Sequence, residues 1–244
     1  MRRRKSIGNG ESNSFTPVST AIAIVADGFQ EDLITCIKSI RDFTDTPIYI
    51  ETSGKENQTL CEPIGQFAGV VTTWQKNKLG WGHSVNKLLT RIDSKYVVIM
   101  DPSTQFAGDA IMPTIAKFAE GYKAVGWRGG LVNLADDWRS TEDKGVGEVD
   151  VLFSYFMAFD REFILDVGGA NPSATYYRNA DIEMSLAIRE NGGKLLQIDL
   201  PLMQGRHHGY HDVNPEYREK NSKKNYQRIL ERFRGREDIL APRR

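Results

Sequence analysis

The alternation of short apolar runs with amphipathic segments in the first half of the chain is the strongest constraint on its fold. The runs rich in β-branched residues are TAIAIVAD (20–27), PIYIETSG (47–54), VVTTWQ (70–75) and KYVVIMD (95–101). Between them, QEDLITCIKSIRDF (30–43) and SVNKLLTRI (84–92) carry apolar residues at helical spacing. Strands that alternate with helices predict an α/β fold with a mostly parallel central sheet, whose ligand crevice lies at the carboxyl ends of the strands.

Composition predicts one large domain. The chain has 244 residues, of which 40% are apolar and 26% charged, as in a typical globular protein. No apolar run reaches the roughly 18 residues needed to span a bilayer, and the basic N-terminus lacks the apolar segment of a secretory signal. We therefore expect a cytoplasmic protein with a disordered basic tail at residues 1–17. Cys36 and Cys61 are too few for a disulfide framework and are expected to be reduced and structural.

The second half departs from simple alternation. EVDVLFSYFMAFDREFIL (148–165) predicts one long strand that runs into a short helix. ADIEMSLAIRENGG predicts a helix that begins near Asp181, where the helix dipole favours an acid, and ends at Gly192 and Gly193. KLLQIDLPLMQGRHHGYHD then predicts a final strand that brings His207, His208 and His211 together.

Polar residues follow the predicted strands where a ligand crevice is expected. Asp27, Glu51 and Asp101 stand at the ends of three strands, and Gly80 and Gly82 lie in the loop KNKLGWGHSVN. Glycines allow the backbone to approach a ligand closely. Each acid taken singly is better explained as a helix cap or turn former. Taken together they favour a binding site.

These motifs resemble the family 2 glycosyltransferases of the GT-A fold over residues 18–212. The resemblance implies transfer of a sugar from a nucleotide-diphosphate sugar to an acceptor hydroxyl. It places Asp27 near the base or ribose, and Glu51 where the family has an aspartate that contacts the base. LGWGHSVN resembles the family's Asn-Leu-Gly-rich stretch, with Lys78 in place of its leading asparagine, followed by Gly80 and, at its close, Asn86.

IMDPST occupies the position of the family's Asp-x-Asp motif, with Asp101 as the first carboxylate and Ser103 in place of the second. The resemblance implies that Asp101 holds Mn²⁺ or Mg²⁺ against the donor diphosphate. One carboxylate is sufficient when phosphate oxygens and waters complete the shell. His207 or His208 is the candidate further metal ligand, since imidazole suits Mn²⁺. The alternative for these histidines is a solvated loop.

RNADIEMSLAIRENGG resembles the family's Glu-Asp-x-Asp segment, with Ala180 replacing the glutamate and Glu183 in the last acidic position. The aligned aspartate, Asp181, is the general base of inverting members, so the resemblance implies inversion at the anomeric carbon. Deprotonation by a positioned carboxylate typically contributes roughly 10²- to 10⁴-fold. The cationic Lys78 or Arg206 would stabilise the leaving diphosphate. In the segment 127–145, predicted to be a loop beside the acceptor, Trp127 or Trp138 would stack on a sugar; each suits a core equally well.

Residues 213–244 predict a basic helical extension. From Pro215 to Arg244 there are ten Lys or Arg and five Asp or Glu, a net charge of +5 in a chain whose overall charge is zero. The basic face would meet an anionic membrane surface at the inner face, a lipid-linked acceptor or an acidic polysaccharide, or remain solvated. The apolar side would pack on the domain or on a second copy of the chain, giving a homodimer.

Other function classes remain open. With one carboxylate in the metal motif, the same fold could be a catalytically inactive nucleotide-sugar-binding module. Nucleic-acid binding through the basic helix is disfavoured, because the chain is neutral overall and has no recognised nucleic-acid motif. A nucleotidyltransferase is disfavoured because VADGFQED has a single glycine after the first strand.

Overall fold

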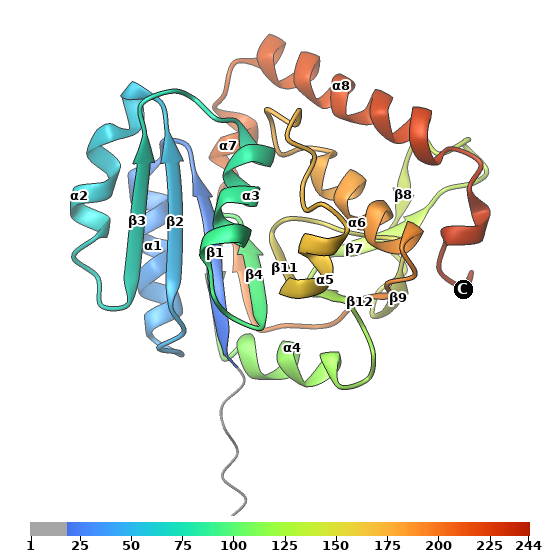
Figure 1. Cartoon of the computed structure of the whole chain (residues 1–244), viewed down its shortest axis with the longest axis horizontal. Helices are drawn as coiled ribbons and strands as arrows, with labels where there is room; N and C mark the ends of the chain where they lie inside the picture. Colours follow the sequence, from blue (N-terminus) through green and yellow to red (C-terminus); the bar gives the residue numbers. More distant parts are fainter. Residues whose placement is uncertain (1–18) are drawn as a thin grey trace, which may run out of the picture.

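The computed structural model describes residues 19–244, so the predicted tail at 1–17 lies outside the described residues. An eight-stranded sheet with the order β3-β2-β1-β4-β11-β6-β12-β9 forms the centre (Figure 1). Its strands are β1 (Thr20–Ala26), β2 (Ile48–Ser53), β3 (Val70–Gln75), β4 (Tyr96–Met100), β6 (Ala124–Gly126), β9 (Gly147–Val149), β11 (Phe156–Asp160) and β12 (Leu195–Gln197). The pairs among β3, β2, β1 and β4 are parallel, as is β6 with β12, whereas β11 and β9 run antiparallel to their neighbours. The prediction of an α/β fold with a mostly parallel sheet is confirmed.

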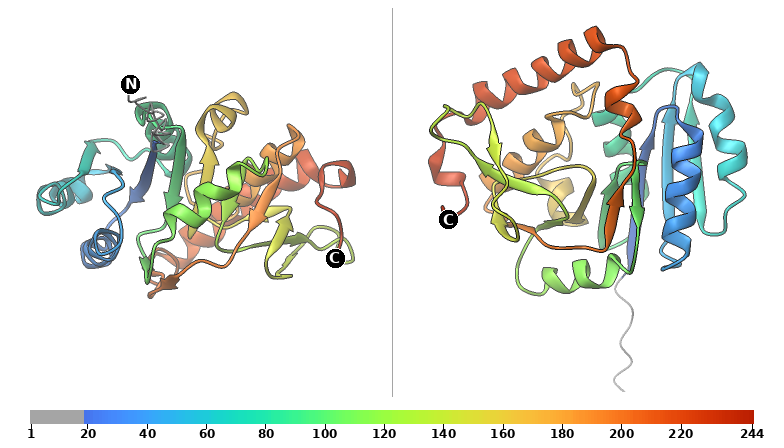
Figure 2. Two further views of the ribbon diagram at one scale, coloured as in Figure 1. Left: turned by 90° about the horizontal axis from the view of Figure 1, so that it is seen from below. Right: turned by 180° about the vertical axis from the view of Figure 1, so that it is seen from behind.

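Helices cover both faces of the sheet. The longer ones are α1 (Gln30–Arg41), α3 (Trp81–Arg91), α4 (Ile111–Phe118), α5 (Arg161–Asp166), α6 (Ala180–Glu190) and α8 (Pro215–Phe233). The shorter ones are α2 (Cys61–Ile64), α7 (His208–His211) and the 3-10 turns Lys55–Leu60 and Glu237–Ile239. α1 and α4 lie on one face, and α3 and α5 lie on the other (Figure 2). The apolar residues of α1 that predicted a helix are all buried: Leu33, Cys36, Ile37 and Ile40.

The sheet has a topological switch point between β1 and β4. The chain runs outward through β1, β2 and β3, then returns to place β4 on the other side of β1. In such sheets a crevice opens at the carboxyl ends of the strands beside the switch point. Asp27 directly follows β1, and Asp101 directly follows β4. Because the two strands are parallel neighbours, both residues lie at the same edge of the sheet.

Residues 148–165 differ from the predicted single long strand. They form β9, then β10 (Val151–Leu152), then β11, and each pairs with different partners. β10 joins β7 (Gly129–Val132), which also pairs with β8 (Thr141–Glu142). The break after β9 lies at Asp150, which is fully buried and whose carboxylate accepts hydrogen bonds from the backbone of Val132 and Ala241. The apolar residues of this run indicate that it is buried, but they do not indicate that successive parts pair with different strands.

Residues 194–212 also form shorter elements than the one final strand predicted. β12 is followed by β13 (Leu202–Gln204), which pairs with β5 (Thr104–Phe106) next to Asp101. α7 then follows directly. This pairing brings the chain after β13 back to the end of β4.

α8 lies across α6 and the β7–β8 hairpin (Figures 1 and 2). Its residues Ile229 and Phe233 are buried in a cluster with Leu186 of α6 and Trp138 of the hairpin. The predicted apolar side of this helix thus packs on the domain itself. Within residues 19–244, no helix has the length and apolar character needed to cross a membrane. Both cysteines are free thiols.

Candidate functional site

A first cavity opens at the carboxyl ends of β1 and β4. Its wall includes the predicted residues Asp27, Lys78, Gly80, Asp101, Ser103, His207 and His208. Residues from the two distant halves of the sequence therefore line one space. We call this space the first cavity.

Asp101 is held by Ser103, two residues further along the chain. Its Oδ1 accepts hydrogen bonds from the Ser103 backbone N–H at 2.8 Å and from the Ser103 hydroxyl at 2.5 Å. Ser103 is buried, so this hydroxyl is committed to orienting Asp101. The second oxygen, Oδ2, is left facing His207.

His207 supplies a second metal-compatible atom at this place. Its Nε2 lies 3.7 Å from Asp101 Oδ2, and it is buried without a hydrogen-bond partner. A buried polar atom without a partner is costly and often marks a missing ion, water or ligand. One carboxylate oxygen and one imidazole nitrogen form a donor set that Mn²⁺ accepts. The residues present therefore fit a divalent cation.

His208 has a different environment. Its Nδ1 is hydrogen-bonded to Asp212, its Nε2 lies 3.4 Å from Asp32, and its ring stacks on Phe29 at 5.0 Å. Both ring nitrogens are therefore engaged by carboxylates. Burial raises the pKa of Asp32, and the hydrogen bond from Arg206 lowers the pKa of Asp212 to about 2. These contacts connect the segment around His208 to Phe29 and Asp32 in the wall of the first cavity. Because both ring nitrogens of His208 are engaged, His207 is the better candidate for a metal ligand.

Within residues 19–244, no group of three or more His, Cys, Asp or Glu side chains is arranged to hold a metal ion. A cation at Asp101 and His207 would need further ligands. Phosphate oxygens and waters complete the shell of a hard cation in many phosphate-binding sites.

A second cavity, of about 640 Å³, adjoins the first and contains Asp181. Asp181 lies in the first turn of α6 and is 6% exposed. Its Oδ2 accepts hydrogen bonds from the Ser154 backbone N–H at 3.0 Å and hydroxyl at 3.2 Å, and its Oδ1 accepts from the Ile182 N–H at 2.9 Å. Burial raises the pKa of Asp181 to about 6, against these hydrogen bonds, which lower it. A carboxylate with this pKa is ionised at neutral pH and is more basic than an exposed one.

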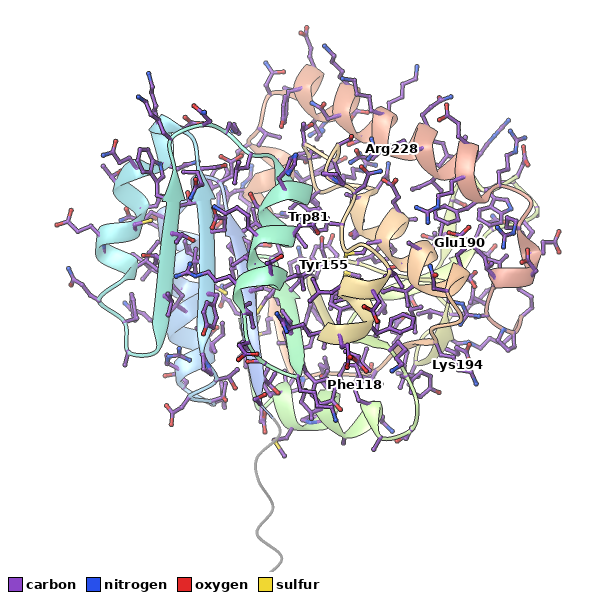
Figure 3. The ribbon with its side chains drawn as sticks, viewed as in Figure 1. Trp81, Phe118, Tyr155, Glu190, Lys194 and Arg228 are labelled. Atoms are coloured by element: carbon purple, nitrogen blue, oxygen red, sulfur yellow. The ribbon has the colours of Figure 1, made fainter. Side chains whose placement is uncertain are left out.

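The two cavities share Ser154, Tyr177 and His207 in their walls. Asp101 and Asp181 therefore stand on either side of one shared wall rather than in a single undivided cavity. Tyr155, labelled in Figure 3, lies in the wall of the second cavity with its ring edge-on to His207, 5.7 Å between centroids. Burial raises the pKa of Tyr155 as well, so it stays protonated near neutral pH.

α8 supports the segment that leads to Asp181. The Asn225 side-chain amide donates hydrogen bonds to the carbonyls of Tyr176 and Arg178, both at 2.8 Å. Asn179, which precedes α6 in a left-handed conformation, donates to the carbonyl of Ser222 at 3.1 Å. The C-terminal helix thus fixes the backbone on which the candidate base depends.

On the other side of the first cavity, Asp27 and Lys78 form a polar cluster. Lys78 Nζ lies 3.0 Å from Asp27 Oδ2 and 3.4 Å from Glu56, and Asn57 donates to Asp27 Oδ1 at 2.9 Å. Gly80 precedes α3 with a φ of 77°, and a Cβ there would lie 2.8 Å from the Thr175 Cα. Glycine at this position lets α3 approach the segment before α6.

The predicted site residues Glu51, Asn86 and Glu183 line neither cavity, and neither do the two tryptophans described next. Glu51 is 1% exposed and is bound by Lys87 at 3.0 Å and Thr73 at 2.5 Å, beneath α3. Asn86 exchanges hydrogen bonds with both backbone groups of Ala170. Glu183 is 4% exposed and paired with Arg228 at 2.8 Å. Each has structural partners that satisfy its polar atoms, which a sequence motif does not reveal.

The two tryptophans lie apart from the first cavity. Trp127 packs, partly buried, against the main core, with the Arg128 guanidinium 4.5 Å from its ring centre. Trp138 is 6% exposed and lines a third cavity, described below. The segment 127–145, predicted to be a loop, contains β7 and β8 and a turn between them.

Phe29, Ser154 and Tyr177 are site residues that the sequence patterns did not single out. Ser154 and Tyr155 lay inside the run that predicted one long strand, so the polar Ser154 appeared to be a strand residue. Phe29 precedes α1 with a φ of 52°, a conformation rare for a bulky residue. No periodicity in the sequence signals such a backbone conformation.

Comparison with solved structures identifies the fold. The chain superposes on the crystal structure of GalNAc-T7 with UDP, GalNAc and Mn²⁺, with a TM-score of 0.66, 16% identity, and coverage of 89% of this chain and 48% of that one. It also superposes on the mannosyltransferase PcManGT from Pyrobaculum calidifontis in complex with GDP-Man and Mn²⁺, with a TM-score of 0.59, 14% identity, and coverage of 87% and 64%. The chain has a GT-A fold. It spans about half to two thirds of these proteins. No family model and no curated protein sequence matches it.

Proposed function

We propose that this GT-A chain is an inverting, metal-assisted glycosyltransferase of the family 2 type, which uses a nucleotide-diphosphate sugar. The observation that carries the proposal is the position of Asp181. This acid is buried at the start of α6, with its pKa raised to about 6, one wall away from Asp101 and His207. The fold alone does not decide function. The pairing of a basic carboxylate with a cation-compatible site supports this one.

In the proposed reaction, the donor occupies the first cavity and the acceptor hydroxyl approaches Asp181 from the second. Asp181 accepts the hydroxyl proton as the bond to the anomeric carbon forms. Ser154 holds the carboxylate in place through its two hydrogen bonds to Oδ2. Attack then comes from the face opposite the leaving group, which inverts the anomeric centre.

The leaving diphosphate gains negative charge on the side of Asp101. Asp101 and His207 would hold the divalent cation, whose Lewis acidity stabilises that charge. Lys78, in the wall of the first cavity, offers a further cation to the donor. Its ion pairs with Asp27 and Glu56 fix the ammonium in the wall before a donor binds.

The test is a panel of nucleotide sugars assayed for transfer and slow hydrolysis with Mn²⁺. We expect turnover with at least one donor and an inverted product configuration. Asp181→Asn should lower turnover by roughly 10²-fold or more while donor binding survives. A product with retained configuration would remove Asp181 from the base role.

A non-catalytic binding module is the second candidate, favoured by the single carboxylate at the metal position and by the lack of a three-residue metal cluster within residues 19–244. Such a module would bind nucleotide sugars with Mn²⁺ and turn none of them over. Donor binding that is equal in the wild type and Asp181→Asn, with no turnover in either, would support this candidate.

A further inference from the structure

A third cavity, of about 560 Å³, lies between α8, the start of α6 and the β7–β8 hairpin. It shares Arg178, Asn179 and Ile182 with the second cavity. Along α6, its lining begins at Ile182, one residue after Asp181, and ends at Leu186. Five residues along a helix correspond to about 7.5 Å. The third cavity therefore continues the second cavity along α6, away from Asp181.

The hairpin wall of this cavity is built at an energetic cost. Asp137 and Trp138 have φ values of 61° and 67°, and consecutive left-handed residues other than glycine are unfavourable. Two contacts hold them: Arg234, which directly follows α8, is paired with Asp137, and the hydroxyl of Tyr226 on α8 donates to the Trp138 carbonyl at 2.8 Å. Strain retained by contacts with a distant helix commonly marks a functional surface.

The lining of the third cavity combines aromatic, hydroxyl and cationic groups. Tyr226 provides a partly exposed ring beside the buried Trp138, and Thr141 provides a hydroxyl. Ser222 also lines it, and its buried hydroxyl has no hydrogen-bond partner. Rings with hydroxyls beside them suit a sugar, which has an apolar face and polar edges. A ligand hydroxyl would supply the bond that Ser222 lacks.

The charge of the lining is positive. Arg139, Arg178 and Lys223 face one lining acid, Glu219. Arg178 reaches Glu219 only at 3.9 Å, and within residues 19–244 neither Arg139 nor Lys223 forms an ion pair. The nearby Asp136 has its carboxylate engaged by the Ser140 hydroxyl and the Arg139 backbone N–H. The charge of Arg139 also interacts with Asp136, so Lys223 is the lining cation that has no carboxylate partner among residues 19–244. A lining with three cations and one acid favours an anionic ligand.

We infer that the third cavity binds an acidic unit, bearing a carboxylate or phosphate, of an oligosaccharide acceptor whose reacting hydroxyl lies at Asp181. This inference rests on the proposed function and names its acceptor class. Lys223 and Arg139 recognise the anionic substituent, and the partly exposed Tyr226 ring packs on the sugar. A lipid headgroup fits the lining less well, since the lining also includes aromatic and hydroxyl side chains.

The experiment uses the full chain, with a galacturonate tetrasaccharide as the probe and neutral maltotetraose as its counterpart of equal length. Lys223→Glu is the test variant, and Lys224→Glu is its matched control. Both lysines are exposed on α8, but only Lys223 lines the third cavity. By titration calorimetry we expect the galacturonate probe to bind the wild type and Lys224→Glu equally. It should bind Lys223→Glu about tenfold more weakly, and maltotetraose should bind all three weakly.

Three outcomes would overturn the inference. They are equal binding of the charged and neutral probes, an equal loss in both variants, and binding to vesicles of anionic phospholipid in preference to the charged probe. Donor hydrolysis in the absence of an acceptor separates this inference from the proposed function. Hydrolysis by the wild type together with equal binding of the charged and neutral probes would overturn this inference alone. Absence of hydrolysis in the wild type would count against the transferase itself.

Discussion

At the scale of single residues, the environment of Asp181 predicts the pH dependence of the reaction. Burial raises its pKa to about 6, and only the ionised form can accept a proton. The ratio kcat/KM should therefore fall about tenfold per pH unit below pH 6 and level off above it. The measurement is kcat/KM from about pH 5 to pH 8 with a donor that turns over. An acid limb near the ordinary aspartate pKa would contradict the assignment.

Ser154→Ala is the matched variant for this profile. It removes the hydroxyl that donates to Asp181 Oδ2 at 3.2 Å and keeps the backbone donor at 3.0 Å. Because a hydrogen bond to the charged form lowers a pKa, its loss should move the acid limb to higher pH, by less than about one unit. A purely structural role for Asp181 would leave the limb in place.

Ser103 gives a second prediction at this scale. Its hydroxyl donates a hydrogen bond of 2.5 Å to the Asp101 carboxylate. Ser103→Ala should therefore keep this carboxylate but leave its orientation less restricted. Loss of such a supporting hydrogen bond typically weakens metal binding about 10- to 100-fold. The concentration of Mn²⁺ giving half-maximal donor binding should rise by about this factor. An unchanged Mn²⁺ requirement would show that Asp101 does not act through a cation.

At the scale of elements, the contact between α6 and α8 predicts how stability is distributed. Arg228 is bidentate on Glu183, whose side chain is 5% exposed (Figure 3 labels Arg228 between the two helices). Arg228→Ala would leave a buried carboxylate without its cation, which typically costs about 3 to 5 kcal/mol. Arg232→Ala breaks an exposed pair with Glu190 and should cost at most about 1 kcal/mol. Denaturant unfolding measures both, and equal costs would contradict this distribution.

The elements also show how far sequence patterns reach. The first four strands and α1 agree with their predicted ranges within a few residues, because each is a short β-branched run or an apolar helix face. The run 148–165 was not resolved into β9, β10 and β11, because burial alone does not specify which strand pairs with which. At the site, Asp101, Lys78 and Asp181 were placed by motif. Glu51 and Glu183 matched the motif equally well, but their partners Lys87 and Arg228 come from distant helices.

At the scale of the whole molecule, contacts made by residues 241–243 predict whether residues 213–244 unfold separately from the rest of the domain. Ala241 donates its backbone N–H to Asp150 Oδ1 at 2.6 Å, and Arg243 donates to Oδ2 at 2.8 Å. Asp150 is fully buried, and its remaining donor is the backbone N–H of Val132 at 2.7 Å. The last residues therefore compensate a charge at the break between β9 and β10.

Deleting residues 241–244 should consequently destabilise the whole chain, not the extension alone. A buried carboxylate that loses its cation typically costs about 3 to 5 kcal/mol, so the single cooperative transition should move to lower temperature. Deleting Arg244 alone removes only exposed hydrogen bonds to the carbonyls of Lys144, Gly145 and Val146, and should change little. Calorimetry distinguishes the cases. A separate transition of residues 213–244 at lower temperature, with the main transition unchanged, would mean that α8 unfolds independently of the domain. In that case α8 could not be the element that fixes the backbone of Tyr176 and Arg178 ahead of Asp181.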